Sequence, residues 1–332
     1  MKISIIGAAG GIGQATALLM SLNFNNVELS LFDIDDSVHG VGLDLSHIPS
    51  SVRVNTYSGY KNINDAISES DIIVITAGIT RKPGMDRREL ISANAKILYP
   101  IIEAIALNCP KAFICLVTNP INSLVPLAAR ILSKFSIFDA KKLFGVTTLD
   151  VLRAKSILED KLNINVNYED FYIMGGHSKS TILPVVNDKI LKKMDSSSYA
   201  YDDFVSDVQN CGDAVVKEKR GRGSATLAMA TAALKFVKSL CLAIEGQEDI
   251  IECAYVATTN KTISPFLAAP LHLTKTGWDS ILIEKKIEPK VESKLLDILA
   301  ILSDDISLGE KVYDLMSLST DISNHKSLAV KC

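Results

Sequence analysis

Short apolar runs alternate with helical stretches along the first 150 residues of the chain. Each run has four to six residues, and an Ala- and Leu-rich helical stretch, Ile12–Ser21, follows the first of them. Short runs of this apolar character are typical of parallel strands that are buried on both faces of a sheet. The alternation therefore predicts a doubly wound, Rossmann-type α/β domain. The runs are Lys2–Ile6, Glu28–Phe32, Asp71–Thr76, Ala112–Val117 and Leu143–Val146.

The pattern changes after about residue 148, where longer helical stretches and antiparallel strands replace the regular alternation. This texture is typical of an α+β domain. We therefore predict two domains, residues 1–147 and residues 148–332, the second of which would be the catalytic domain. The predicted elements of this second part are Leu149–Leu162, Asp170–Met174, Asp202–Lys219, Ser224–Leu242, Ile250–Ala257, the Pro- and Gly-punctuated segment as far as Ile283, and a last helix around Glu292–Met316.

The charge balance is close to neutral and argues against two classes of partner. Lys and Arg number 35 against 38 Asp and Glu, which gives a formal net charge of −3. Neither a nucleic acid nor an anionic membrane surface is favoured, because both attract proteins that carry an excess of basic residues. Hydrophobic residues make up 48% of the chain, which is enough to fill a large core and excludes a disordered chain.

The sequence does not favour a membrane or an oxidising compartment either. The two long uncharged runs, residues 3–27 and 112–129, are interrupted by glycines and polar residues, so neither is predicted to span a membrane. The six cysteines form no CxxC pair, and we predict reduced thiols and no bound metal. Because the chain opens on MKISIIG, a strand and a turn rather than a targeting peptide, we expect a cytoplasmic protein.

A glycine-rich segment stands between the first predicted strand and the first predicted helix. Residues 7–13 read GAAGGIG, a GxxGxxG spacing that departs from the commoner GxGxxG. Glycines allow the backbone to turn tightly and to approach a pyrophosphate, whose charge the N-terminus of the helix stabilises. A strand-to-helix turn without any ligand is the alternative. The candidate cofactor-binding residues of this segment are Gly7, Gly10, Gly11, Ile12 and Gly13.

Asp33 strengthens the nucleotide interpretation. It ends the second apolar run, 20 residues after Gly13, where this fold places the acid that accepts hydrogen bonds from the adenosine ribose. Asp35 and Asp36 follow it, and no Arg or Lys stands nearby to receive a 2′-phosphate. The sequence therefore predicts NAD rather than NADP as the cofactor.

Four further segments place polar residues where the packing of a core alone does not require them. Residues 79–88 form a loop with a Pro-Gly centre, and residues 118–120 follow the next apolar run, at the sheet edge where doubly wound folds bind ligands. Residues 148–153 put an acid and a base on one helix face, and residues 175–177 put an imidazole at a strand end. The candidate residues are Arg81, Arg87, Asn119, Asp150, Arg153 and His177.

Each of these segments has a simpler interpretation when it is taken alone. Loops rich in Arg are usually solvated, an Asp–Arg pair three residues apart is usually a helix salt bridge, and a single histidine is usually structural. The case for a catalytic site therefore depends on their combination. The histidines without a comparable setting, which we predict to be structural, are His39, His47, His272 and His325.

The combination resembles a known family. The segments GAAGGIG, AGITRKPGMDR, VTNPIN, FGVTTLDVLRA, GGHSKSTILP and GSATLAM stand in the order and spacing of the NAD-dependent malate dehydrogenases. The resemblance covers nearly the whole chain and is greatest to the bacterial and mitochondrial subgroup of the lactate/malate dehydrogenase family. The related lactate dehydrogenases share the Asp, Arg and His set but carry Gln where this chain has Arg81.

The resemblance implies a reversible oxidation of (S)-malate to oxaloacetate with NAD⁺. His177 would be the general base that takes the proton of the C2 hydroxyl, and Asp150 would stabilise the imidazolium that forms. Arg153 would hold the C1 carboxylate and Arg81 the distal carboxylate, while Arg87 would polarise the C2 oxygen. Asn119 would position both the substrate and the nicotinamide, and the other positions that match cofactor contacts of the family are Asn94, Val117 and Met229.

Two segments depart from the family pattern. Lys179 stands where the loop after the histidine usually has a glycine, and the run before GSAT contains Lys219, Arg220 and Arg222 in place of small residues. Both segments border the substrate pocket in the family. Extra cations there would strengthen the binding of dianionic substrates, admit larger substrates, or point into solvent, and we expect the last.

Two other functions stay open from the residues alone. One is another NAD-dependent 2-hydroxy-acid dehydrogenase, acting on lactate or an aromatic 2-hydroxy acid, although Arg81 would then face an apolar side chain without a partner. The other is a catalytically idle NAD-binding protein, although no group that the chemistry needs is missing. The resemblance also implies a homodimer, with the segment Val41–Ile48 at the interface, and a tetramer is the alternative.

Overall fold

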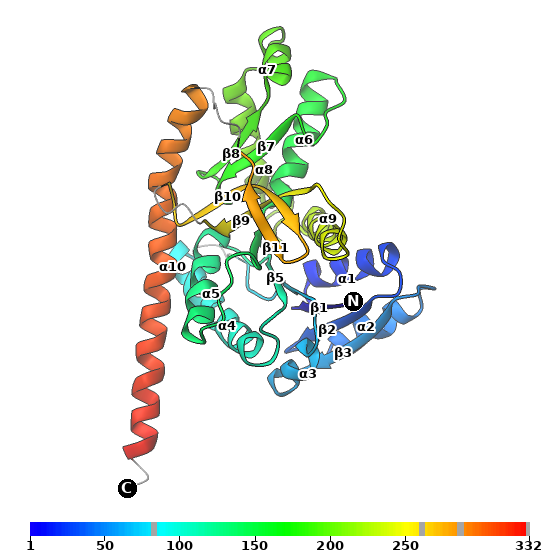
Figure 1. The fold of residues 1–332 in the computed structure, drawn as a ribbon, viewed down its shortest axis with the longest axis vertical. Coiled ribbons are helices and arrows are strands. Elements are labelled where there is room, and N and C mark those ends of the chain that lie inside the picture. The colour runs from blue at the N-terminus through cyan, green and yellow to red at the C-terminus, as the bar shows by residue number, and fades with distance from the viewer. Residues whose placement is uncertain (81–84, 259–262, 284–288, 330–332) are drawn as a thin grey trace.

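The computed structural model describes residues 1–80, 85–258, 263–283 and 289–329, except for the side chains of Arg87 and of residues 319–329 (Figure 1). Among these residues, eleven strands join into one sheet in the order β3-β2-β1-β4-β5-β6-β9-β10-β7-β8, and β11 pairs with β10. The first six strands of this order are parallel, and every later pairing is antiparallel. The parallel order 3-2-1-4-5-6 confirms the Rossmann prediction.

The six parallel strands reproduce the predicted apolar runs and add one. The strand that was not predicted, β3 (Arg53–Ser58), reads RVNTYS and lies at the sheet edge, where its residues are mostly half-buried. A polar edge strand gives no apolar run, so its sequence carries little signal. The other five are β1 (Lys2–Ile6), β2 (Glu28–Asp33), β4 (Ile72–Ile75), β5 (Phe113–Leu116) and β6 (Leu143–Val146).

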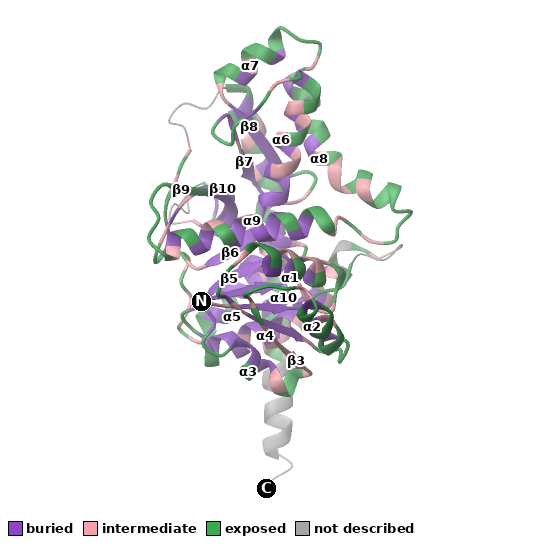
Figure 2. Ribbon diagram, turned by 90° about the vertical axis from the view of Figure 1, so that its right-hand side faces the viewer, coloured by how far each residue is buried: buried purple, intermediate pink, exposed green. Residues whose placement is uncertain are grey.

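Helices cover both faces of this sheet, and alternation within the strands divides the core between them. In β4, Ile72 and Val74 belong to the core on the face of α1, α2 and α9, while Ile73 and Ile75 belong to the core on the face of α3, α4, α5 and α10. Figure 2 shows the buried residues concentrated along the strands. The helices of the first part are α1 (Gly11–Asn23), α2 (Val38–Ser46), η1 (Tyr60–Asn62), α3 (Ile63–Ile67), α4 (Arg87–Asn108) and α5 (Ile121–Lys134).

The second part of the chain extends the sheet through β9, which pairs antiparallel to β6. The predicted domain boundary falls between the end of β6 at Val146 and the start of α6 at Thr148, and it stays a prediction. Strand β8 was missed because Pro184 interrupts the apolar run ILPVV. The elements are α6 (Thr148–Leu162), β7 (Phe171–Gly175), β8 (Ile182–Val186), α7 (Asp188–Asp195), α8 (Tyr201–Glu218), α9 (Leu227–Ile244), β9 (Ile250–Ala257), β10 (Phe266–Thr274), β11 (Gly277–Ile281) and α10 (Pro289–Ala329).

Helix α10 runs along one side of the molecule and ends beyond its body (Figure 1). It begins before and ends after the predicted stretch, Glu292–Met316. It packs against α5 and touches α4, β7 and β8. The contact with α5 is close: a Cβ placed on Gly309 would lie 2.1 Å from the carbonyl oxygen of Ser123. The hydroxyl of Ser123 donates to the carbonyl of Asp305 at 2.7 Å. The C-terminal helix is thus fixed to α5, the helix that follows β5.

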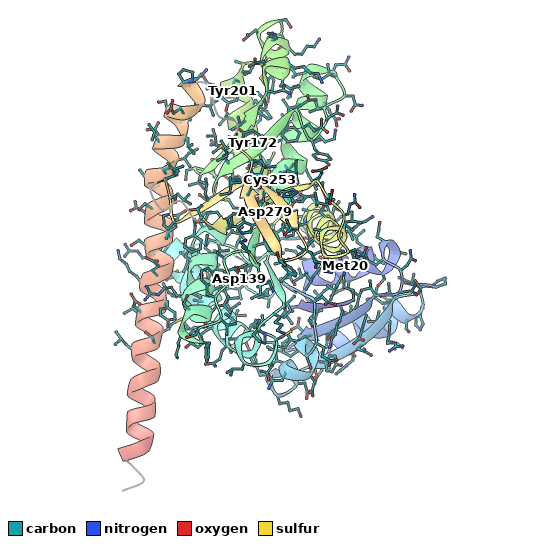
Figure 3. The ribbon with its side chains drawn as sticks, viewed as in Figure 1. Met20, Asp139, Tyr172, Tyr201, Cys253 and Asp279 are labelled. Carbon is teal, nitrogen blue, oxygen red and sulfur yellow. The ribbon has the colours of Figure 1, made fainter. Side chains whose placement is uncertain are left out.

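The buried apolar helices and the cysteines agree with a large, tightly packed core. By length and composition alone, the Arg88–Asn108 part of α4 and all of α9 are apolar enough to cross a membrane, and 56% of the most apolar window of each is buried within the protein. The five cysteines among the described residues are free. Burial raises the pKa of the Cys253 thiol, which lies at the centre of Figure 3, to about 12. Such a thiol stays protonated and unreactive.

Candidate active site

The glycine-rich segment forms the tight turn that the sequence predicts. Gly7 has a φ of +93°, and a Cβ on it would lie 2.5 Å from the backbone nitrogen of Ala77. A Cβ on Gly13 would lie 2.2 Å from the carbonyl oxygen of Gly7. Gly10 is the N-cap of α1, and no side chain caps the helix there. The backbone N–H groups at the start of α1 are therefore left for an anion such as a pyrophosphate.

Asp33 lies beside this turn, at the end of β2. Its Oδ2 accepts a hydrogen bond from the N–H of Ala9 at 2.9 Å, and its Oδ1 accepts one from the N–H of Asp35 at 3.2 Å. The hydroxyl and backbone N–H of Ser37 hold the pKa of the Asp35 carboxyl below its usual range. A cavity of about 350 Å³ opens next to this acidic edge, and its lining includes Gly10, Asp33 and Tyr60. Its walls offer carboxylates and an aromatic ring, which are suitable partners for a ribose diol and a base.

A second cavity, of about 500 Å³, shares Thr76, Gly78 and Ile79 with the first. It lies at the carboxyl ends of β4 and β5, where this fold binds ligands. The candidate residues Ile12, Val117 and Asn119 line it. Its other lining residues are Thr80, Leu90, Thr118, Asp213, Val216, Gly221, Gly223 and Ser224.

The buried side chain of Asn94 joins two loops of this second cavity. Its Oδ1 accepts from the N–H of Ile79 at 2.8 Å, and its Nδ2 donates to the carbonyl of Asn119 at 2.7 Å. Asn94 thus ties the loop after β4 to the loop after β5. Met229, the last of the cofactor candidates, is buried in the same core cluster as Val117 and does not line the cavity.

His177 and Asp150 form a short hydrogen-bonded pair. The Nδ1 of His177 lies 2.6 Å from the Oδ2 of Asp150, whose side chain is fully buried. The Nη1 of Arg153 lies 3.4 Å from the other carboxylate oxygen. Asp150 also sits in the first turn of α6, whose N-terminus favours a negative charge. A buried carboxylate needs such partners, because an unpaired one would cost several kcal/mol.

Helix α8 connects this pair to the second cavity. The Nζ of Lys179, in the loop after His177, lies 2.9 Å from the Oδ2 of Asp213, which lines the cavity. A Cβ on the preceding residue, Gly212, would lie 4.0 Å from the Nη1 of Arg153. The structure therefore brings Asp150, Arg153 and His177 together beside α8, whose Asp213 lines the second cavity, although none of the three residues lines that cavity itself. The exposed Lys179 is paired with Asp213 and does not point into the cavity as a free cation.

The backbone of His177 is held by a residue that our sequence analysis did not single out. Its N–H donates to the Oδ1 of Asn122 at 2.8 Å. A Cβ on Gly176 would lie 2.7 Å from the Nδ2 of the same amide, so the glycine is needed for this close approach. Asn122 is the last residue of the segment VTNPIN, and its place in that segment was the available signal.

Two candidate residues lie wholly or partly outside the described residues. Arg81 lies outside the described residues, and so does the side chain of Arg87, although its backbone begins α4. The neighbouring Asp86 caps that helix: its carboxylate accepts from the N–H of Glu89, and the Glu89 side chain accepts from the N–H of Asp86. The roles of Arg81 and Arg87 therefore stay predictions.

The chain is similar to known proteins over nearly its whole length. Residues 1–145 match the lactate/malate dehydrogenase NAD binding domain, and residues 147–313 match the lactate/malate dehydrogenase alpha/beta C-terminal domain. The chain is 41% identical over 313 residues to a malate dehydrogenase of Aeromonas hydrophila, covering 93% of this chain and 98% of the relative. It is 42% identical over 312 residues to one of Histophilus somni, covering 94% and 99%.

A solved malate dehydrogenase of Picrophilus torridus, in its apo form, has the same fold. It superimposes with a TM-score of 0.77 at 23% sequence identity, over 94% of this chain and 98% of that one.

Proposed function

The chain belongs to the lactate/malate dehydrogenase family and acts as an NAD-dependent malate dehydrogenase, and we propose that its His177–Asp150 pair carries the proton of the reaction. The observation that carries this proposal is the 2.6 Å contact between the imidazole Nδ1 and a fully buried carboxylate. The other 2-hydroxy-acid dehydrogenases and an idle NAD-binding protein are not favoured, since the relatives are malate dehydrogenases.

The pair is arranged to move a proton at the second ring nitrogen. An ionised Asp150 accepts a hydrogen bond, so the Nδ1 of His177 carries the proton and its Nε2 keeps a lone pair. When malate is oxidised, Nε2 takes the proton of the C2 hydroxyl, and the carboxylate balances the charge of the imidazolium. In the reverse direction the imidazolium returns this proton to the oxygen of oxaloacetate.

The arginines supply the binding of the two carboxylates in this proposal. Arg153 is half-buried beside Asp150 and is close enough to hold the substrate's C1 carboxylate next to His177. Guanidinium groups bind carboxylates with two parallel, charge-assisted hydrogen bonds, which fix orientation as well as position. Arg81 would bind the distal carboxylate, Arg87 would polarise the C2 oxygen, and Asn119 would position the substrate and the nicotinamide.

The residues around the two cavities fit NAD. The turn at Gly7, Gly10 and Gly13 and the free start of α1 would hold the pyrophosphate, and Asp33 would accept from the adenosine ribose. The second cavity, next to Asn119, would hold the nicotinamide ring. When bound, NAD⁺ supplies the acceptor for the hydride that leaves C2 of malate.

The cofactor preference gives a direct test of Asp33. A 2′-phosphate would place negative charge against its carboxylate, so NADP(H) should work poorly. We expect Asp33→Ser to narrow the ratio of kcat/KM between NADH and NADPH by about tenfold or more, which corresponds to the loss of one charged contact. Asp36→Ser is the matched control, because Asp36 stands three residues further on and does not line the cavity. A wild-type protein that uses both cofactors equally would contradict the role of Asp33.

Substrate choice separates the malate reaction from its alternatives. The experiment follows NADH absorbance with oxaloacetate, pyruvate and phenylpyruvate in parallel. We expect oxaloacetate to be preferred, because the proposal gives each of its two carboxylates an arginine partner, Arg153 and Arg81. A preference for pyruvate or phenylpyruvate would point to another 2-hydroxy acid, and no turnover with any of the three would point to an idle protein.

The assembly and location of the protein are further parts of the proposal. We propose a homodimer that uses the segment Val41–Ile48, which begins within α2 and ends two residues beyond it. A cavity of about 530 Å³ is lined mostly by residues of α1 and α2. The apolar side chains of Leu18 on α1 and Leu43 on α2 are exposed. Analytical ultracentrifugation should give a particle mass twice that of one chain, and Leu43→Glu should lower this mass toward that of the monomer. We also propose a cytoplasmic location, as the sequence predicts.

A further inference from the structure

We infer that Asp305, on the C-terminal helix, is a positioning residue for His177 and acts through the amide of Asn122. This inference rests on the proposed role of His177 as the acid–base group. Asp305 is 2% exposed and lies 183 residues from Asn122 in the chain. Asp305 is a buried carboxylate that takes no part in the proton transfer between malate and His177. Its Oδ2 accepts a hydrogen bond from the Nδ2 of Asn122 at 2.9 Å.

The Asn122 amide links this carboxylate to the histidine. Its Oδ1 accepts from the backbone N–H of His177 at 2.8 Å, while its Nδ2 donates to Asp305 and also to the hydroxyl of Thr181 at 3.0 Å. An amide has one acceptor end and one donor end. If it turned over, its oxygen would face the Asp305 carboxylate and its NH₂ would face the N–H of His177. Asp305 therefore sets the only orientation in which Asn122 accepts from His177.

The surroundings allow little movement of this chain of hydrogen bonds. Asn122 is 1% exposed, and its own carbonyl accepts from the hydroxyl of Tyr255 at 3.3 Å. Burial raises the pKa of Tyr255 well above its ordinary value, so that hydroxyl stays a neutral donor. Asp305 in turn is fixed by the contact of α10 with α5, where Gly309 meets the carbonyl of Ser123. The position of the C-terminal helix is thus transmitted to the catalytic loop.

The position of the His177 backbone matters because the imidazole ring must make two contacts at the same time. Its Nδ1 must stay within hydrogen-bond reach of Asp150, and its Nε2 must meet the substrate oxygen. The loop closes on itself after His177, with the N–H of Gly176 donating to the carbonyl of Thr181 at 2.8 Å, whereas the N–H of His177 donates to Asn122 at 2.8 Å. A displacement of about 1 Å at a reacting group can cost roughly 100-fold in rate. The amide of Asn122 is the anchor that prevents such a displacement.

Two variants of matched shape test this inference. Leu has the same branched shape as Asp but accepts no hydrogen bond, whereas Asn keeps one acceptor. We expect Asp305→Leu to lower kcat for oxaloacetate reduction by about 10- to 100-fold, with NADH affinity unchanged. Asp305→Asn should lower kcat by less, about threefold to tenfold, because the neutral amide no longer forces one orientation on Asn122. Asp314→Asn is the control on the same helix, since its exposed carboxylate pairs with Arg130 at 2.9 Å, and kcat should not change.

A double-variant cycle distinguishes positioning from a general loss of structure. If Asp305 acts through Asn122, then Asp305→Leu should slow an Asn122→Leu protein by no more than about twofold, because the anchor is already absent. Additive losses in kcat would overturn the inference. So would a wild-type kcat in both Asp305 variants.

A spectroscopic readout makes the test independent of turnover and of the proposed function. The chain has five histidines, so selective ¹⁵N-histidine labelling gives five backbone amide signals, and the His177→Asn variant identifies the one of His177. We expect Asp305→Asn and Asp305→Leu to move this signal, and Asp314→Asn to leave it in place. If the signal does not move in the Asp305 variants, the inference is wrong even when oxaloacetate is the substrate. If it moves but the wild-type protein does not reduce oxaloacetate, the proposed function fails, and with it the catalytic meaning of the positioning.

Discussion

Replacing His177 with Asn should lower turnover by roughly 10²–10⁴-fold, the usual contribution of general acid–base catalysis, while NADH binding stays nearly intact. Asn keeps a polar side chain of similar reach but cannot accept and return the proton. Asp150→Asn should also slow turnover, because an amide preserves the packing around a fully buried group but cannot balance the charge of the imidazolium. The measurements are kcat for oxaloacetate reduction and the dissociation constant of NADH.

The chain provides a matched pair of control variants. The Nδ1 of His272 lies 2.9 Å from the Oδ1 of Asp279, which Figure 3 labels on β11, and this contact lowers the pKa of the Asp279 carboxyl. The two pairs have the same chemistry, but the second is partly exposed and lies away from both cavities. His272→Asn and Asp279→Asn should therefore leave kcat unchanged. Near-wild-type turnover in His177→Asn or Asp150→Asn would remove the assignment of the acid–base pair.

The fold was predictable where local sequence and burial agree. Strands β1, β5 and β9 are apolar over nearly their whole length because both of their faces are covered, so their sequences alone indicate them. The polar edge strand β3 has no such pattern, and in β8 Pro184 interrupts an otherwise apolar run, so both strands form because a neighbouring strand offers hydrogen bonds to them. Tertiary pairing determines these two strands, and a single sequence does not display it.

The site residues were likewise predictable where their chemistry lies within one short segment of the sequence. His177, Asp150, Asn119 and the glycine turn come from segments whose chemistry is visible within a few residues. The support beneath them is not visible in this way, since Asn122 and Asp305 are 183 residues apart and meet only when α10 packs on α5. Asn94 is a similar case: the resemblance implies a cofactor contact, while the structure shows its amide joining two loops of the cavity.

Arg81→Gln should lower kcat/KM for oxaloacetate by at least about tenfold, while pyruvate should lose little or improve. A charge-assisted contact between a guanidinium and a carboxylate contributes about 1.5–3 kcal/mol, or roughly 10- to 150-fold. A distal carboxylate that is left desolvated without a partner costs more, on the order of 3–5 kcal/mol. Pyruvate has no distal carboxylate, so in the wild-type protein its methyl group would face the unpaired charge of Arg81. The Gln variant removes that charge. The lactate dehydrogenases that this chain resembles carry Gln at the same place.

Arg153 provides the comparison that makes the result specific. It lies beside Asp150, with its Nη1 3.4 Å from the carboxylate, and in the proposal it binds the C1 carboxylate that oxaloacetate and pyruvate share. Arg153→Ala should therefore damage both reactions by a similar factor, whereas Arg81→Gln should change the ratio between them. The experiment measures kcat/KM for both substrates in the wild-type protein and in the two variants. If Arg81→Gln lowers both values by the same factor, Arg81 does not select the substrate, and the preference for malate must come from another residue.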